Sequence, residues 1–151
     1  MRRMRTLAAC IGSIALTAGE VAADDVTDVR AAAEDWVAAL NAGDAVALAP
    51  YYHAEETSFG GGPGDLLTEG THTEAKMSAM FESGFKPDLQ WRHLTVNVFG
   101  KAAVLTGYLA GSVTLPDGTV LQNSWRTSVM WIHQGDSWQV VHFHASTLLP
   151  K

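Results

Sequence analysis

The sequence predicts an α+β fold in which a curved antiparallel β-sheet wraps over helices that come first in the chain. Apolar residues at helical spacing occupy the first half, whereas alternating apolar residues and turn sequences occupy the second half. This segregation of helices from strands favours α+β over an alternating α/β arrangement. The chain has 151 residues, of which 47% are hydrophobic, and this is enough for the core of one domain.

The N-terminus has the layout of a secretory signal peptide. Arginines at the start precede a mostly apolar run, and small residues end this segment at Ala23. We expect a signal peptide over 1–23 and a single domain over 24–151 that is exported to the periplasm or secreted. The apolar run is shorter than the roughly 20 residues that a membrane-spanning helix needs, so no membrane association is expected.

Cys10 follows Leu7-Ala8-Ala9, which resembles the lipobox of bacterial lipoproteins. Because the apolar run continues past Cys10, we expect an ordinary signal peptide and not a lipid anchor. Cys10 is the only cysteine, so cleavage after Ala23 leaves none. This excludes a disulfide framework and a thiolate zinc site from the predicted domain.

The predicted domain is acidic, with seven Lys and Arg against fifteen Asp and Glu, or about −8 with histidine neutral. Such a surface repels phosphate backbones and anionic lipids. Because no cluster of basic residues with interleaved aromatic residues is found, nucleic acid is not an expected partner.

Helix signals in the first half come from periodicity and from capping residues. Gly43 can end the first helix, Asp44 can cap a short second helix that Pro50 closes, and Thr71 can cap a third. The predicted elements are helices over 24–41, 45–49 and 72–83, a short strand within 51–59 and a glycine-rich loop over 60–64.

Four long strands in meander order are predicted in the second half. Turn sequences join them at Phe99-Gly100-Lys101, Leu115–Thr119 and Gln134–Ser137. Four such strands form a strongly curved sheet, and a curved sheet covered by a long helix encloses a cone that can admit a small molecule. The predicted strands cover 89–99, 102–115, 119–133 and 137–148.

Together with this order of elements, Arg126–Trp131, the Gly135–Trp138 turn and Val140–Ser146 resemble the nuclear transport factor 2-like superfamily, which has a cystatin-like fold. Within it, the chain is most similar to SnoaL-like and ketosteroid isomerase-related domains and to the association domain of calcium/calmodulin-dependent protein kinase II. The resemblance covers residues 25–149 and implies the cone-shaped fold. It does not decide the function, because the superfamily includes isomerases, dehydratases, hydrolases and assembly domains.

Two histidines lie two residues apart in the last predicted strand, where alternation sends them to one face together with Val140. We expect His142 and His144 to face the interior of the cone as candidate catalytic groups, because histidine titrates near neutrality. The alternative is that both rings only hydrogen-bond neighbouring strands. They can also supply two metal ligands, but this spacing alone is not specific, and neither a metal nor a cofactor is expected.

Arg126 shares one face of the preceding strand with Ser128 and Met130. A guanidinium inside an apolar cone needs a carboxylate, so we expect Arg126 and Ser128 to contact a carboxylated ligand, or Arg126 to pair with Glu55 or Glu69. The alternative is a solvated surface arginine.

The segment 51–59 is expected to cross the mouth of the cone and to contribute further site residues. Glu55 is a candidate general acid or base, and only one of Glu55 and Glu56 can face inward; the alternative is a solvated loop charge. Tyr52, Phe59 and Trp91 are candidate ligand contacts in an aromatic wall. Ketosteroid isomerase-like enzymes use an acidic base with a tyrosine and a protonated acid, and we find no counterpart of that acid pair here.

Three functions remain open. The first is an exported binding protein that holds a small molecule, such as a carboxylated one, through Arg126 and His144. The second is a cofactor-independent isomerase-, dehydratase- or hydrolase-type enzyme in which His144 or Glu55 moves a proton. The third is an oligomeric assembly domain. Trp125, Val129 and Trp131 share one side of a strand, which predicts an apolar convex face and a homodimer formed through the sheet.

Overall fold

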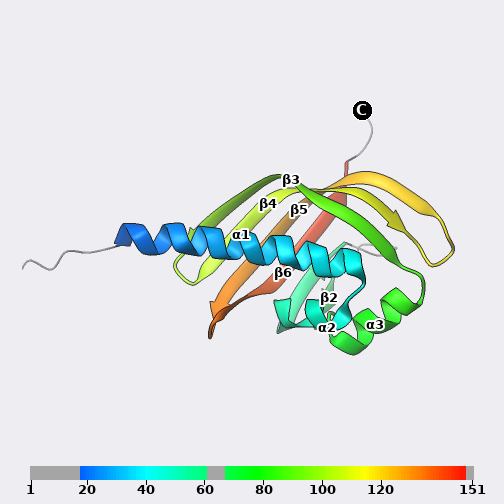
Figure 1. The fold of residues 1–151 in the computed structure, drawn as a ribbon, viewed down its shortest axis with the longest axis horizontal. Coiled ribbons are helices and arrows are strands. Elements are labelled where there is room, and N and C mark those ends of the chain that lie inside the picture. The colour runs from blue at the N-terminus through cyan, green and yellow to red at the C-terminus, as the bar shows by residue number, and fades with distance from the viewer. Residues whose placement is uncertain (1–17, 61–66, 149–151) are drawn as a thin grey trace, which may run out of the picture.

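The computed structural model describes residues 18–60 and 67–148, with side chains from residue 24 onward. The helices are α1 over Ala18–Ala42, α2 over Ala45–Leu48, the 3₁₀ helix η1 over Ala49–Tyr51, and α3 over Glu74–Glu82. The strands are β1 over Tyr52–Phe59, β2 over Thr68–Glu69, β3 over Lys86–Phe99, β4 over Ala102–Thr114, β5 over Val120–Gln134 and β6 over Ser137–Thr147. The sheet curves around α1, so the predicted α+β fold is confirmed (Figure 1).

The expected signal peptide falls largely on residues 1–17, which lie outside the described part of the chain, as does most of the glycine-rich loop 60–64. Cleavage after Ala23 therefore stays a prediction. None of the helices in the described ranges is long and apolar enough to cross a membrane.

α1 begins at Ala18, earlier than the predicted residue 24, and the predicted caps are found with one shift. Asp44 Oδ1 accepts a hydrogen bond from the Ala47 N–H at 2.9 Å and caps α2 as expected. α3 begins two residues later than predicted, with Thr73 as its cap instead of Thr71. Thr73 Oγ1 accepts a hydrogen bond from the Lys76 N–H, whereas the Thr71 hydroxyl contacts Thr68 Oγ1 and His72 Nδ1 instead.

The sheet has the strand order β2-β1-β6-β5-β4-β3. The predicted meander of four long strands is confirmed by the antiparallel pairs β3–β4, β4–β5 and β5–β6. β1 adds a parallel pair with β6, and the short β2 completes the edge. The segment before the meander is thus part of the same sheet.

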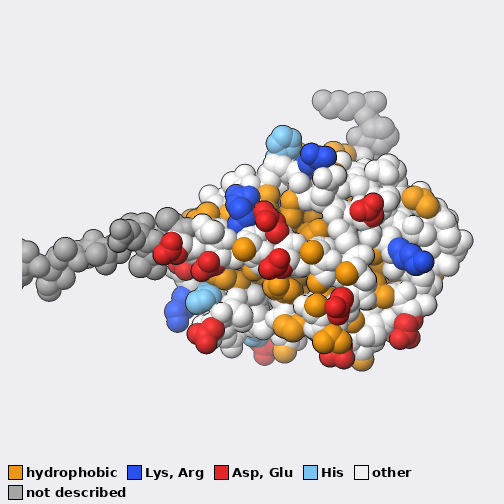
Figure 2. Space-filling model, viewed as in Figure 1, with side chains coloured by type: hydrophobic (Ala, Val, Ile, Leu, Met, Phe, Trp, Pro, Cys, Tyr) orange, Lys and Arg blue, Asp and Glu red, His pale blue; other side chains and the backbone are white. Residues whose placement is uncertain are grey.

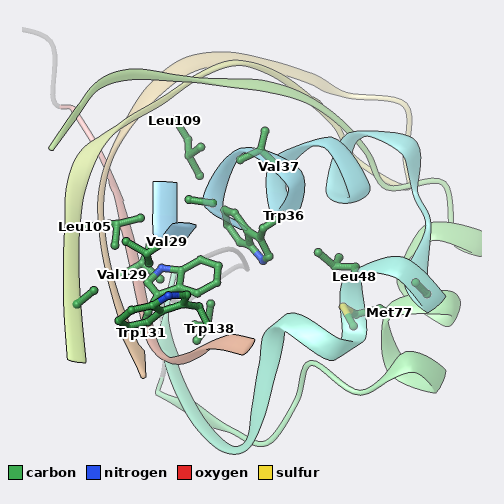
Figure 3. Close-up of a cluster of buried hydrophobic side chains, with 14 residues drawn as sticks. Val29, Trp36, Val37, Leu48, Met77, Leu105, Leu109, Val129, Trp131 and Trp138 are labelled. Carbon is green, nitrogen blue, oxygen red and sulfur yellow. The ribbon is translucent and has the colours of Figure 1, made fainter. Parts of the chain in front are cut away.

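We call the side of the sheet that faces α1 the inner face and the opposite side the outer face. The inner face carries the core, in which Trp36 of α1 packs near Val129 and Trp131 of β5, all at most 1% exposed (Figure 3). The prediction that Val129 and Trp131 cover the convex face is therefore wrong. They do share one side of the strand, but alternation does not say which side faces the helix.

A bulge in β6 reverses the alternation halfway along that strand. Trp131 pairs with Val140, but its neighbour Met130 pairs with His142, which leaves Val141 as the extra residue. Phe143 therefore points inward and contacts Trp36, with ring centroids 5.7 Å apart. His142 and His144 lie on the outer face, so the prediction that they face the interior of the cone is wrong.

Candidate functional site

A buried carboxylate on β1 is the centre of the candidate site. Glu56 is only 1% exposed. Its Oε1 accepts hydrogen bonds from the backbone N–H groups of Thr71 at 2.7 Å and His72 at 3.2 Å, and it lies 2.9 Å from His72 Nδ1. Its Oε2 is buried and has no hydrogen-bond partner among the described residues. One oxygen is thus fully engaged and the other is free to accept.

The turn after β2 explains why these donors reach Glu56. Gly70 has a φ of +54°, a conformation that favours glycine, and its N–H donates to the Glu56 carbonyl oxygen at 2.8 Å. A Cβ at this position would lie 3.0 Å from the Ala54 carbonyl oxygen. The chain therefore turns closely over β1, and the next two N–H groups point at the carboxylate.

Opposing effects act on the acidity of Glu56. Burial raises the pKa of its carboxyl. The hydrogen bond and charge of His72, together with the N–H groups of Thr71 and His72, lower this pKa, and their combined effect is larger than that of burial. The net pKa of Glu56 is below its ordinary value of 4.5. Glu56 is therefore an anion at neutral pH.

Tyr52 connects this carboxylate to the aromatic core. Its ring stacks on His72, with centroids 4.2 Å apart and planes 5° from parallel, and it meets Trp36 edge-on at 6.3 Å. Burial raises the pKa of Tyr52; the Trp36 indole opposes this rise and the Glu56 charge adds to it. Tyr52 is therefore a neutral phenol beside an ionised carboxylate.

A partly open cavity of about 150 Å³ lies at this point of the fold. Its wall combines polar groups with small residues, and the 26% exposed side chain of His72 contributes to it. The lining residues are Ala49, Tyr52, His53, Ala54, Glu56, Gly70, His72 and Thr73.

Of the residues predicted from sequence, the structure brings Tyr52 to this cavity. Glu55 is exposed on the outer face and Glu56 takes the inward place, so the choice of Glu55 as the inward carboxylate is wrong. Trp91 faces inward, where its indole N–H donates to the Ala33 carbonyl oxygen at 3.1 Å. Alternation from Tyr52 through Glu56 to Ser58 was the signal that could have identified the buried carboxylate.

The other predicted site residues lie on the outer face, away from the cavity. Arg126 and Ser128 are exposed, so the expected inward orientation of Arg126 is wrong. Arg126 and Ser128 do share one face of β5, as the alternation predicts. This face is the one opposite Val129, which is buried on the inner face. Whether Arg126 and Ser128 contact a ligand stays a prediction.

His142 and His144 contact β1 across the parallel pair. His142 Nδ1 lies 2.8 Å from Thr57 Oγ1, and the exposed ring of Phe59 packs on His142 and His144 with centroids 5.8 and 6.1 Å away. The alternative that these histidines interact with neighbouring strands fits this geometry. Within residues 18–60 and 67–148, no group of three or more His, Cys, Asp or Glu side chains is arranged to hold a metal ion.

The surface seen from the α1 side carries scattered acidic side chains and few basic ones (Figure 2). This agrees with the formal net charge of −6 for the whole chain. The candidate site is therefore a buried anion in an acidic molecule.

Comparison with solved structures supports the fold. A candidate dehydratase of the nuclear transport factor 2-like family from Streptomyces avermitilis has a TM-score of 0.70 at 15% identity, covering 85% of this chain and 99% of that chain. The association domain of Caenorhabditis elegans calcium/calmodulin-dependent protein kinase II has a TM-score of 0.69 at 17% identity, covering 85% and 100%. A ketosteroid isomerase-like protein from Erwinia carotovora has a TM-score of 0.67 at 19% identity, covering 84% and 98%.

At these identities the solved structures show a shared fold and leave the activity open. A search of curated proteins finds no match. The family model described as the SnoaL-like domain matches residues 29–150, which is most of the chain. The protein therefore belongs to the SnoaL-like domain family.

Proposed function

We propose that this protein is an exported SnoaL-like domain that binds a small molecule in the cavity beside Glu56. The observation that carries the proposal is the asymmetry of the Glu56 carboxylate, in which Oε1 has three donors and the buried Oε2 has none. A buried acceptor without a partner costs roughly 1–3 kcal/mol. A ligand that donates a hydrogen bond to Oε2 removes this cost.

The chemistry of the cavity favours a ligand that is a donor or a cation over a carboxylated one. Glu56 is ionised, and the acidic surface repels anions. Tyr52 and His72 stack on each other in the cavity wall, and the partly exposed His72 ring offers a surface against which a flat molecule can pack. The ligand is therefore a small, planar molecule with at least one N–H or O–H group.

Thermal unfolding with small donor probes tests this proposal. Imidazole and phenol should raise the Tm of the wild-type protein and should have a much smaller effect on Glu56→Gln, whose amide carries no charge. Glu55→Gln is the matched control, because it removes the same charge from the neighbouring exposed residue. Equal shifts in the wild type and Glu56→Gln would overturn the proposal.

A second candidate function is proton transfer, as in an isomerase- or dehydratase-type enzyme. It is favoured by the 2.9 Å contact between His72 Nδ1 and Glu56 Oε1, because a carboxylate can orient an imidazole that gives or takes a proton. A compound turned over by the wild type but not by His72→Gln would support this candidate. If the probes bind but no compound is turned over, the enzyme candidate is rejected and only the binding function remains.

A homodimer through the outer face and export through the N-terminal segment belong to the same proposal. Met130 is 45% exposed and Phe59 is 41% exposed on that face, which favours a partner surface there. Light scattering coupled to size exclusion should give a dimer for the wild type and a monomer for Met130→Arg. Mass spectrometry of the exported protein should find Asp24 as its first residue.

A further inference from the structure

We propose that a groove on the outer face of the sheet is a separate binding site for a small organic anion, held by Arg126 with help from Arg92. This site is distinct from the cavity at Glu56. Its ligand is an anion, whereas the ligand proposed for the cavity at Glu56 is a hydrogen-bond donor or a cation.

Two arginines stand on either side of one tyrosine in this region. Arg92 of β3 pairs in register with Tyr108 of β4, and Tyr108 pairs in register with Arg126 of β5. Residues directly opposite one another in a ladder share a face, so the three side chains form one row on the outer face. Both arginines are exposed.

The charges of these arginines are not neutralised within the part of the chain that the structure describes. The ion pair found there joins His72 and Glu56 and involves neither arginine. Arg126 has one long hydrogen bond, from Nη2 to the Thr147 carbonyl oxygen at 3.4 Å. In a chain with 16 acidic and 10 basic residues, two unpaired guanidinium groups that flank one tyrosine form a local positive site.

Tyr108 and Arg126 of this row line a groove of about 290 Å³ that also presents hydroxyl groups, and Arg92 directly precedes the lining residue His93. No hydrogen bond between described residues uses the side-chain oxygens of Thr106, Tyr108 or Ser128, which are therefore available to a ligand. The residues lining the groove are His93, Thr106, Gly107, Tyr108, Arg126, Thr127 and Ser128.

A bulge in β3 forms one wall of the groove. His93 and Leu94 together oppose Gly107, and His93 has a φ of +53°, the one non-glycine residue with positive φ in the described ranges. A Cβ at Gly107 would lie 3.1 Å from the Arg92 carbonyl oxygen and 3.2 Å from Leu94 Cα. The bulge therefore brings the backbone of β3 close to Gly107, and it places the His93 ring edge-on to Tyr108 at 6.3 Å.

These features identify the chemical class of the ligand. A guanidinium binds carboxylate and phosphate oxygens through two parallel N–H donors, and the hydroxyl groups can donate to the same oxygens. The acidic molecule repels polyanions, so the ligand carries one or two negative charges. The shared chemistry is an oxyanion on a small molecule, either a carboxylate or a phosphate.

Titration of the full chain with benzoate and with inorganic phosphate tests this proposal. Amide NMR shifts should map to the groove, and Arg126→Gln should weaken binding about tenfold, the loss expected when one charge-assisted contact is removed. Lys101→Gln is the matched control, because Lys101 is exposed in the turn between β3 and β4 and does not line the groove. Saturation by benzoate alone identifies a carboxylate site, and saturation by phosphate alone identifies a phosphate site.

Arg92→Gln should produce a smaller loss than Arg126→Gln, and Glu56→Gln should leave anion binding unchanged. The last comparison separates this site from the cavity. The proposal is overturned if neither anion shifts the groove amides, or if Lys101→Gln weakens binding as much as Arg126→Gln, since the attraction is then diffuse.

Discussion

The inner and outer faces of the sheet differ in the sign and the burial of the charged groups they carry. The inner face is mainly apolar, but it buries the carboxylate of Glu56, which receives three hydrogen bonds on one oxygen. The outer face leaves Arg92 and Arg126 exposed beside Tyr108. A single curved sheet thus separates a buried carboxylate from exposed guanidinium groups, and the ligands that we propose for the two places have opposite charges.

The two faces also differ in how much their side chains contribute to stability. Inner side chains such as Trp131 are fully buried, whereas its neighbour Met130 is 45% exposed. Substitutions on the two faces should therefore differ in their cost by several kcal/mol.

Trp131→Ala should reduce the free energy of unfolding by about 3–5 kcal/mol, since it empties a fully buried site. The neighbouring Met130→Ala should change it by no more than about 0.5 kcal/mol in the monomer. Urea unfolding of both variants at the same protein concentration measures the difference. Similar losses would contradict the assignment of the faces.

Glu56→Gln should cost about 1–3 kcal/mol at neutral pH, because the three donors on Oε1 lose a charged acceptor. Glu55→Gln serves as the control and should lie within about 0.5 kcal/mol of the wild type. Urea unfolding provides both values. An unchanged free energy of unfolding in Glu56→Gln would show that the buried charge contributes nothing to the stability of the fold.

The stability contribution of the Glu56 charge should depend on pH. Its pKa in the folded protein is below the ordinary value of 4.5, so the contribution is fully present above about pH 4.5 and is lost as the pH falls through the folded-state pKa. The difference in unfolding free energy between wild type and Glu56→Gln should therefore shrink in acid. Urea unfolding over roughly pH 7 to 3 tests this. A difference that grows in acid would reverse the inferred sign of the pKa shift.

Arg126→Gln should have the smallest effect on stability, within about 0.5 kcal/mol, because the arginine is exposed and has only one long hydrogen bond. Thermal unfolding measures this value. A loss of 2 kcal/mol or more, on the order of a buried-contact mutation, would make Arg126 a structural residue.

Much of the fold could be predicted because local signals and tertiary contacts agree. The turn sequences between β3 and β6 and the cap at Asp44 each specify their own element, and the structure has them at the expected places. The parallel pair of β1 with β6 could not be predicted, since nothing local to either strand specifies a partner far along the chain.

The site was harder to predict for two physical reasons. Alternation gives two faces of a strand without saying which one meets the helix, and this misplaced Arg126 and Trp131. The bulge at Val141 then reversed the alternation before His142, with no glycine to mark it. Alternation in β1 indicates that only one of Glu55 and Glu56 faces inward, but it does not say which one, and the donors at Thr71 and His72 depend on how the turn after β2 folds back.

The parallel pairing of β1 with β6 has a consequence for how the molecule assembles. Thr57 and His142 contact each other although 85 positions separate them in the chain. Closing so long a loop costs entropy, whereas the hairpins from β3 to β6 close over short distances, so we expect the hairpins to form first. Glu56 lies on the strand that joins late, so a chain cut short before β6 would have no finished cavity.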